Sequence, residues 1–160
     1  MAPNSRFAVA VHVMTALAHN RGRWVSSPAL AQSVRTNPVV IRRLLIRLRR
    51  SGLVEAHTGT AGGVQLARKP ESITLLDIFR AVEGGSPFLL PDKPENKACE
   101  VSCAMKPLLA TVLAETDRAI AKSLEKVRLS DLEREVSSAA MAAPGRGVSS
   151  GRGTGRTGGV

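Results

Sequence analysis

The chain has 160 residues and a formal net charge of +10, from 23 Lys and Arg against 13 Asp and Glu. This length suits one domain with appendages, and no apolar run approaches the roughly 18 residues that a membrane-spanning helix needs. The N-terminus lacks a charged segment followed by a continuous apolar core and a cleavage site. We therefore expect no signal peptide, no membrane contact and a cytoplasmic location.

The positive charge is concentrated in the first part of the chain. Residues 1–70 carry 11 Lys and Arg and one acid, Glu55, whereas residues 71–136 carry 9 basic and 12 acidic residues. Residues 137–160 add three arginines and no acid. A segregated positive patch attracts phosphates and releases counterions on binding, which indicates that the N-terminal half binds nucleic acid.

Two helices and a possible short strand are predicted before residue 35. Arg6 to His19 is mostly apolar and predicts a buried first helix. Its apolar residues at helical spacing are Phe7, Val11, Met14 and Leu17 or Ala18. Trp24-Val25 is a candidate strand that would pair with a hairpin further along. Ser27 to Val34 predicts a short second helix, with Ser27 as N-cap and Pro28 at the first helical position.

A break at Arg35-Thr36 leads into a third, arginine-rich helix. Asn37 is a good N-cap, Pro38 suits the first helical position, and Gly52 suits the position just after the helix. One apolar stripe recurs at i, i+3, i+4 and i+7; it consists of Ile41, Leu44, Leu45 and Leu48. The arginines on the other faces are Arg43, Arg47 and Arg50, flanked by Arg42 and Arg49.

A glycine-rich hairpin follows this helix. The apolar segments Leu53-Val54 and Val64–Leu66 flank Thr58–Gly63, in which three of six residues are glycine. Glycine permits positive φ and close approach to a phosphate backbone. Two helices joined by a short turn form a helix-turn-helix, whose second helix enters the major groove. The predicted fold class is therefore mainly α with a small antiparallel β-wing, a winged helix-turn-helix plus a long dimerisation helix.

The alternative interpretation of the same segment is an amphipathic surface helix followed by an ordinary hairpin, because runs of charge usually face solvent.

A further helix closes the winged module, which we expect to span residues 1–84. Thr74 and Asp77 form an approximate capping box, and Gly84-Gly85 ends the helix. Its predicted buried face consists of Leu75, Ile78, Phe79 and Val82.

The rest of the chain divides into a loop, a long helix and a tail. Residues 85–106 form an effector and cysteine loop, and residues 107–136 hold the dimerisation helix and a short terminal helix from Ser130. The long helix should start at Met105 or Pro107 and run to about Val127. Its apolar stripe consists of Leu108, Val112, Leu113, Ile120, Leu124 and Val127. A helix of about 20 residues spans some 30 Å, which is longer than the winged module needs to close its own core, so we interpret it as a dimerisation helix. The alternative interpretation is that the helix packs back on its own domain. Residues 137–160 have almost no large apolar side chains and should be disordered.

Cys99 and Cys103 are the two cysteines of the chain, four residues apart. They are candidate redox sensors that form a disulfide with each other or with a second subunit. They could instead belong to a metal or iron–sulfur site, which usually needs four ligands, or be incidental. Two cysteines from each of two subunits would supply four ligands if the pairs converged.

The chain resembles the Rrf-two family of winged helix-turn-helix transcriptional regulators, the family of IscR and NsrR. The matching runs are SRFAVAVHVMTALA, NPVVIRRLLIRLRRSGLVEA, GTAGGVQLARKPESITLLDIFRAVEG and LSDL, which together extend from about Ser5 to Leu132. The resemblance implies a homodimer whose long helices cross, a palindromic operator in double-stranded DNA, and modulation by an effector.

Two departures from the family indicate its cluster-free branch. Cluster-binding members carry three cysteines in the loop that spans Pro91 to Met105 here, where this chain has two. They also tend to carry Tyr-Leu-Glu where this chain has Val40-Ile41-Arg42. We therefore expect no cofactor and no metal ligands.

These observations predict a homodimeric, sequence-specific repressor modulated by a thiol-redox or small-molecule signal. The first turns of the third helix should enter the major groove, with Arg42 or Arg43 reading bases, while the wing approaches the minor groove. The residues expected to contact DNA are Ser26, Ser27, Asn37, Val39, Val40, Arg42, Arg43, Arg47, Thr58, Gly59, Thr60 and Gly62.

Two other functions compete with this one. The first is a protein that binds nucleic acid through the same positive charge but without sequence preference. Against it stands the scarcity of aromatic side chains that could stack on bases, since the chain has three Phe, one Trp and no Tyr. The second is an iron–sulfur or metal-dependent regulator with an atypical two-cysteine site. An enzyme is not expected, because the chain offers no paired carboxylates, no nucleophile–base set and no phosphate-binding glycine loop that opens a helix. A pocket between the winged module and the long helix would suit a small effector.

Overall fold

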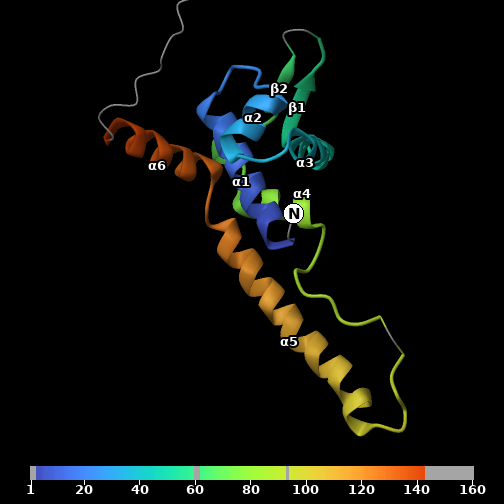
Figure 1. The fold of residues 1–160 in the computed structure, drawn as a ribbon. Helices are drawn as coiled ribbons and strands as arrows, with labels where there is room; N and C mark the ends of the chain where they lie inside the picture. Colours follow the sequence, from blue (N-terminus) through green and yellow to red (C-terminus); the bar gives the residue numbers. More distant parts are fainter. Residues whose placement is uncertain (1–2, 60–61, 93, 143–160) are drawn as a thin grey trace, which may run out of the picture.

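The computed structural model describes residues 3–59, 62–92 and 94–142. Figure 1 shows a compact module made of the first four helices and a β-hairpin, with a long helix extending from it. In chain order the elements are α1 (Pro3–His19), α2 (Ser27–Val34), α3 (Pro38–Arg50), β1 (Val54–His57), β2 (Gly63–Leu66), the 3-10 helix η1 (Pro70–Ser72), α4 (Leu75–Glu83), α5 (Glu100–Glu125) and α6 (Leu129–Ala142). The predicted fold class is confirmed.

Helix α1 lies at the centre of the hydrophobic core. It packs against α2, α4, α6 and β2, because a helix that is apolar on most sides must be covered on most sides. Its buried apolar residues are Ala10, Val13, Met14, Leu17 and Ala18. The predicted buried helix is confirmed, although Phe7 and Val11 at the start of the expected stripe are only half-buried. Phe7 instead meets Phe79 of α4 edge-on, with ring centroids 5.4 Å apart.

The start of α2 differs from the prediction by one residue. Ser26, not Ser27, is the N-cap, and its Oγ accepts a hydrogen bond from the N–H of Ala29 at 3.3 Å. Ser27 therefore becomes the first helical residue and Pro28 the second. Proline is tolerated at either position, because N–H groups of the first turn have no partner within the helix.

Helix α3 has the predicted ends. The side chain of Asn37 accepts a hydrogen bond from the N–H of Val39 at 2.8 Å, and Pro38 follows at the start of the helix. After Arg50, Gly52 has a φ of +67°, the left-handed conformation that suits glycine. All four residues of the predicted apolar stripe are buried, namely Ile41, Leu44, Leu45 and Leu48.

The wing is a two-stranded antiparallel hairpin. β1 and β2 pair from Val54 opposite Leu66 to His57 opposite Gly63. The strand expected at Trp24-Val25 is reduced to one isolated bridge, in which Val25 exchanges two backbone hydrogen bonds of 2.9 Å with Val64.

Helix α4 has the predicted capping box. Thr74 Oγ1 accepts from the N–H of Asp77, and the Asp77 carboxylate accepts from the N–H of Thr74. Gly84 ends the helix with a φ of +72°. The buried face is Leu76, Ile78 and Val82, whereas the expected Leu75 and Phe79 are half-buried. Leu76 was missed because it turns toward α5, whose position the sequence of α4 does not reveal.

Helix α5 starts earlier than predicted. It begins at Glu100, so Pro107 lies inside the helix rather than at its first position, and Cys103 belongs to the helix. Proline inside a helix leaves the carbonyl four residues earlier without its N–H partner. That carbonyl belongs to Cys103, an exposed residue, where water can satisfy it.

Helix α6 extends beyond its predicted end. It continues to Ala142, so residues 137–142 of the expected disordered tail are helical. These residues are rich in alanine, the best helix former, and the Ser137 hydroxyl donates a hydrogen bond of 2.6 Å to Glu133 one turn earlier. The rest of the expected tail, residues 143–160, lies outside the described residues.

Candidate nucleic-acid interface

Helices α2 and α3 form a helix-turn-helix, and backbone hydrogen bonds fix the turn between them. Arg35 adopts a left-handed conformation with a φ of +60°, and its N–H donates to Gln32 O. The N–H of Thr36 donates to Ala31 O at 2.9 Å. Leu30 and Ala31 are buried, which anchors α2 on the core.

The exposed face of α3 combines arginines with two apolar side chains. Successive residues turn by about 100° around a helix axis, so Val39, Arg43, Ile46 and Arg50 lie opposite the buried stripe. Val39 is 45% exposed and Ile46 is 52% exposed. Apolar side chains of this kind can contact the methyl group of thymine. Ile46 was not among the predicted contacts, although its position off the apolar stripe is visible in the sequence.

The predicted contact residues of α2 and α3 do not all face the same way. Asn37, Val39, Arg42 and Arg43 are exposed around the first turns of α3. Val40 is half-buried and lines a pocket with Arg6 on the α1 side.

The two serines before α2 are also unequal. Ser26 is exposed, with its hydroxyl oxygen engaged as the N-cap, whereas Ser27 is half-buried.

Arg47 has a partner within the protein. Its Nη1 donates to the backbone oxygen of Val82 at 2.9 Å, at the C-terminal end of α4. Arg6 of α1 donates to the same oxygen at 3.4 Å and forms an ion pair of 3.3 Å with Glu83. Arg47 therefore has a structural role, which sequence spacing did not predict, in addition to any contact with DNA.

Glycine is required at the wing for steric reasons. A Cβ on Gly62 would lie 2.4 Å from the backbone oxygen of His57, and a Cβ on Gly63 would lie 2.8 Å from that of Val25. Gly59 has a φ of +117°. Thr58 and Gly59 are exposed, and Gly62 is half-buried; Thr60, another predicted contact, lies outside the described residues.

An aromatic pair flanks the wing. Trp24, which is 40% exposed, lies against the ring of His57 with centroids 5.4 Å apart. Glu55, the one acid among residues 1–70, accepts a hydrogen bond from Gln65 on the neighbouring strand. The excess of positive charge on this surface therefore comes from the arginines of α3 and not from the wing.

Comparison with known proteins identifies the family of this helix-turn-helix. The model of the Rrf2 (Rrf-two) family, described as an iron-dependent transcriptional regulator, matches residues 4–135. The chain belongs to the Rrf2 family.

Relatives and solved structures agree with this assignment. The chain is 30% identical over 129 residues to the HTH-type transcriptional regulator YwnA of Bacillus subtilis (strain 168), covering 81% of this chain and 95% of YwnA. CymR (YrzC), the global cysteine regulator of B. subtilis, superposes with a TM-score of 0.60 at 26% identity, over 81% of this chain and 94% of CymR. IscR of T. potens gives a TM-score of 0.62 at 26% identity, over 89% and 90% of the two chains.

Membership in the Rrf2 family makes the chain a DNA-binding transcriptional regulator with a winged helix rather than an enzyme. Within residues 3–59, 62–92 and 94–142, no helix has both the length and the apolar character to cross a membrane.

The cysteines of this Rrf2 member do not fit an iron site within one chain. Cys99 is half-buried at the N-cap of α5, and Cys103 is exposed one turn later, with its Sγ 3.6 Å from the backbone oxygen of Asn96. Among the described residues, no group of three or more His, Cys, Asp or Glu is placed to hold a metal ion. Two thiolates fall short of the four ligands that clusters and structural zinc usually require.

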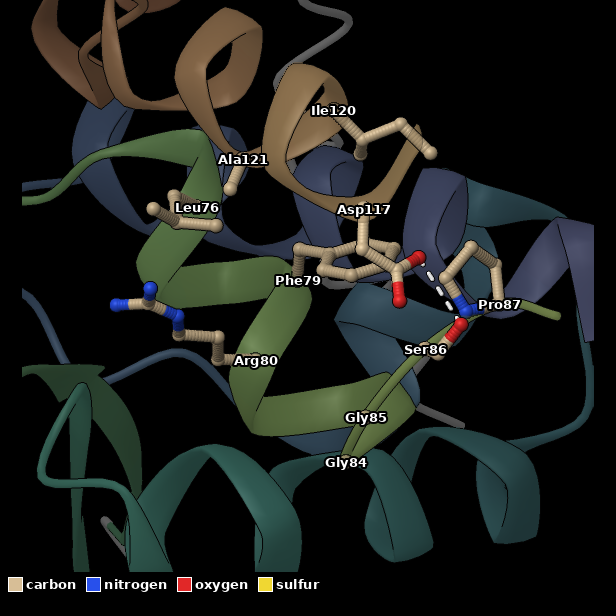
Figure 2. A pocket seen from close by; sticks show the side chains of 10 residues that line it. All are labelled: Leu76, Phe79, Arg80, Gly84, Gly85, Ser86, Pro87, Asp117, Ile120 and Ala121. Carbon is tan, nitrogen blue, oxygen red and sulfur yellow. Dashed lines mark hydrogen bonds between the residues drawn. The ribbon is translucent and has the colours of Figure 1, made fainter. Parts of the chain in front are cut away.

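A cavity of about 310 Å³ lies between α4 and α5, where a small effector was expected to bind. Figure 2 shows Phe79 and Arg80 of α4 on one side and Asp117 of α5 on the other. The Ser86 hydroxyl closes one end by donating a hydrogen bond of 2.9 Å to Asp117. This pocket touches both the winged module and the long helix.

Proposed function

We propose that this Rrf2-family regulator is a homodimeric, sequence-specific repressor that reads a palindromic operator. The observation that carries the proposal is the exposed face of α3, where arginines and apolar side chains project from a helix fixed by the preceding turn. Arg42 and Arg43 are the candidates for reading guanine, whose O6 and N7 suit a guanidinium. The wing and Ser26 would contact phosphates on either side of the groove.

The N-terminal half of α5 supports the dimer. Four exposed apolar residues recur at spacings of four, three and four, and they are Val101, Met105, Leu108 and Val112, each 48–64% exposed. This is the spacing of helices that pack along one another. The structure describes all of α5, and none of its residues is buried. A second copy is the natural occupant, because an identical seam can meet itself across a two-fold axis.

Selection from a random library of 30-base-pair duplexes with the full chain tests the reading of DNA. We expect enrichment of one two-fold symmetric sequence, and lower in-vitro transcription from a promoter that contains it. Equal binding of selected and scrambled duplexes would instead support binding without sequence preference.

A charge placed in the seam tests the dimer. Leu108→Asp should convert the dimer to a monomer in size-exclusion chromatography with light scattering. Ala110→Asp is the matched control, because Ala110 lies about 180° around the helix from Val101. A monomeric wild type, or dissociation by both variants, would contradict this role of the seam.

The positions of the cysteines favour a signal within one subunit. Cys103 follows Val101 by two residues and so lies about 200° around the helix from the seam. Cys99 and Cys103 are joined by the first backbone hydrogen bond of the helix, 3.1 Å long. Cys99 is the extended N-cap residue, whereas Cys103 lies in the first turn of the helix. A disulfide, which needs Cβ atoms about 3.5–4.5 Å apart, would constrain this turn of α5, where the seam begins.

This redox proposal requires no resident cofactor. Peroxide would accept two electrons and two protons from the two thiols, giving one disulfide and two waters. We expect anaerobically purified protein to be colourless and to lose dimer affinity and operator affinity after peroxide, whereas Cys103→Ser should not respond. Visible absorbance with bound iron would favour the cluster alternative. Loss of both thiols without a change in binding would leave a small-molecule signal, for which the cavity between α4 and α5 is the candidate site.

A further inference from the structure

Two guanidinium groups meet at one carbonyl oxygen beside α3. Arg6 Nη1 and Arg47 Nη1 both donate to the backbone oxygen of Val82, at 3.4 and 2.9 Å. Arg6 belongs to α1 and Arg47 to α3, 41 residues later in the sequence. Their guanidinium groups meet at the C-terminal end of α4. That end carries the negative pole of the helix dipole, which favours cations. The two like charges are thereby held close together.

A third arginine completes the cluster. Arg43 lies one turn before Arg47 on α3, and the three arginines line a pocket of about 260 Å³. Its remaining lining residues are Val40 and Leu44, which are apolar. Each guanidinium has five N–H donors, and within the described part of the chain the side chain of Arg43 makes no hydrogen bond or ion pair. Most donors of the cluster are therefore available to a ligand.

The charge of the cluster is only partly balanced. Glu83 is the acid beside it, and Arg6 pairs with Oε2 of this carboxylate at 3.3 Å. The other oxygen, Oε1, is buried and has no hydrogen-bond partner among the described residues. Three positive charges thus face one negative charge, and the described residues that line the pocket are the three arginines, Val40 and Leu44. A planar guanidinium group can donate two parallel hydrogen bonds to two oxygens of one phosphate.

We propose that Arg6, Arg43 and Arg47 form a clamp for a phosphate group, and that its occupant is a backbone phosphate of bound DNA. The proposal rests on the DNA-binding function proposed above, and it adds Arg6 of α1, which sequence spacing did not select. It assigns Arg43 to a phosphate rather than to a base, so Arg42 remains the candidate for reading guanine. Arg43 lies on the exposed face of α3, opposite the buried stripe, so the pocket adjoins the surface that would meet the duplex. A free phosphate ion has the same chemistry and is the competing source.

Glu83 gives the clamp a distinctive signature. Before DNA arrives, the carboxylate holds Arg6; in the complex, Arg6 shares its donors between this carboxylate and the phosphate. Removing the charge of Glu83 should therefore strengthen DNA binding, whereas loss of the ion pair alone would only destabilise the fold. An ion pair that only stabilises the fold predicts no gain in DNA affinity when the charge of Glu83 is removed, so the affinity of this variant separates the two roles.

The test uses the full chain, the selected duplex and a scrambled duplex of equal length, with affinity measured by fluorescence anisotropy between 50 and 200 mM salt. Each phosphate contact adds about one to the slope of log affinity against log salt. Arg6→Gln and Arg47→Gln should each reduce the slope by about 1 per half-site, on both duplexes alike. Glu83→Gln should raise affinity on both duplexes. Arg134→Gln, which removes an exposed arginine of α6, is the charge-matched control.

The melting temperature of each variant separates a missing contact from a damaged fold, because Arg6 and Arg47 also cap α4. A variant that melts like the wild type but has a reduced slope supports the clamp. Unchanged slopes in Arg6→Gln and Arg47→Gln, with intact discrimination between duplexes, would overturn the clamp and leave the proposed function standing. Equal affinity of the wild type for both duplexes would overturn the function, while the slopes would still test the clamp.

Titration with inorganic phosphate distinguishes the two sources. Arginine side-chain NMR signals should show at most weak binding, which DNA abolishes by occupying the pocket. Tight, saturable phosphate binding that is lost in Arg6→Gln and is unaffected by DNA would assign the pocket to a free anion and overturn the DNA clamp.

Discussion

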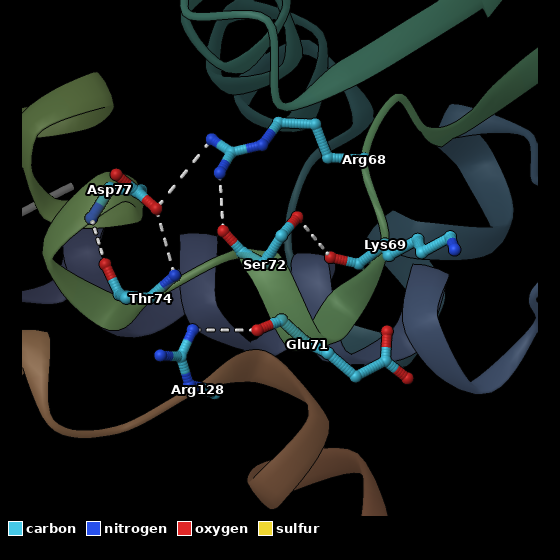
Figure 3. Close-up of polar contacts among 7 residues, drawn as sticks. All are labelled: Arg68, Lys69, Glu71, Ser72, Thr74, Asp77 and Arg128. Carbon is cyan, nitrogen blue, oxygen red and sulfur yellow. Dashed lines mark hydrogen bonds and ion pairs between the residues drawn. The ribbon is translucent and has the colours of Figure 1, made fainter.

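Thr74, the N-cap of α4, pairs with Arg128, at the junction of α5 and α6, through an isolated antiparallel bridge. The N–H of Leu75 donates to Val127 O at 2.9 Å, and Arg128 Nη1 donates to the backbone oxygen of Glu71 at 2.8 Å (Figure 3). The C-terminal end of the long helix is thus fixed to the winged module beside its capping box. In the proposed dimer, the direction of α5 would therefore set the separation of the two DNA-reading helices.

The capping box at this junction gives the first prediction. Thr74→Ala removes the oxygen that accepts from the N–H of Asp77, and we expect it to lower the free energy of unfolding by about 1 kcal/mol. Urea unfolding at fixed protein concentration measures the change. Thr111→Ala is the control, because the hydroxyl of Thr111 donates to Pro107 O within an exposed part of α5 and caps no helix. Equal effects of the two substitutions would contradict a special role for the cap.

The wing gives the second prediction. In Gly62→Ala the new methyl group would lie 2.4 Å from the oxygen of His57 and 2.8 Å from that of Gly59, and both are backbone atoms that cannot rotate away. We expect a loss of about 1–3 kcal/mol of stability, as for other overpacked sites, together with weaker DNA binding. Gly85→Ala, where a Cβ meets nothing within 4 Å, should leave both unchanged. Wild-type affinity in Gly62→Ala would show that the wing tip does not contact DNA.

Local sequence rules predicted α3 and α4 well, because their ends depend on neighbouring residues. Asn37, Pro38 and Gly52 mark the ends of α3, and Thr74 with Gly84 marks those of α4, through side chains that bond backbone groups a few residues away. The same rules misplaced the start of α5. Pro107 resembles a first helical residue, and the sequence does not show that the carbonyl it leaves unpaired is exposed.

The contacts around Arg6 and Arg47 could not be predicted from sequence in this way. Arg6 meets Val82 and Glu83 across more than 75 residues of chain, and such pairs depend on how whole helices pack. The spacing of the arginines on α3 indicated a basic surface, but not that Arg47 caps another helix. The exposure of Arg42 and Val39 was easier to predict, because it follows directly from the position of the apolar stripe on α3.

The junction of α6 with α1 gives a pH-dependent prediction. A hydrogen bond from Ser137, and to a lesser degree the nearby His19, lowers the pKa of Glu133 below its ordinary value of 4.5, although desolvation opposes the shift. A carboxylate with a lowered folded-state pKa stabilises the fold above its ordinary pKa, and this contribution is lost as pH falls through the folded-state value. The wild type should therefore exceed Glu133→Gln in melting temperature at pH 7 by more than at pH 3. The difference should be small, because the side chain of Glu133 is still partly accessible to solvent, which screens the charge. Glu135→Gln is the neighbouring control, and a difference that is the same at both pH values would contradict this role of Glu133.

The last prediction concerns which arginine reads the operator. Arg42 is exposed on the second turn of α3, and a bidentate contact from a guanidinium to guanine contributes about 1–3 kcal/mol of discrimination against the wrong base. Arg42→Ala should therefore relax the preference at one position of each half-site, as measured by competition among singly substituted duplexes. Arg49→Ala is the control, because Arg49 lies two turns further along nearly the same face, beyond the first turns expected in the groove. If Arg42→Ala instead weakened binding to every duplex equally and lowered the salt slope, Arg42 would be a phosphate contact, and base reading would fall to the exposed Val39 and Ile46.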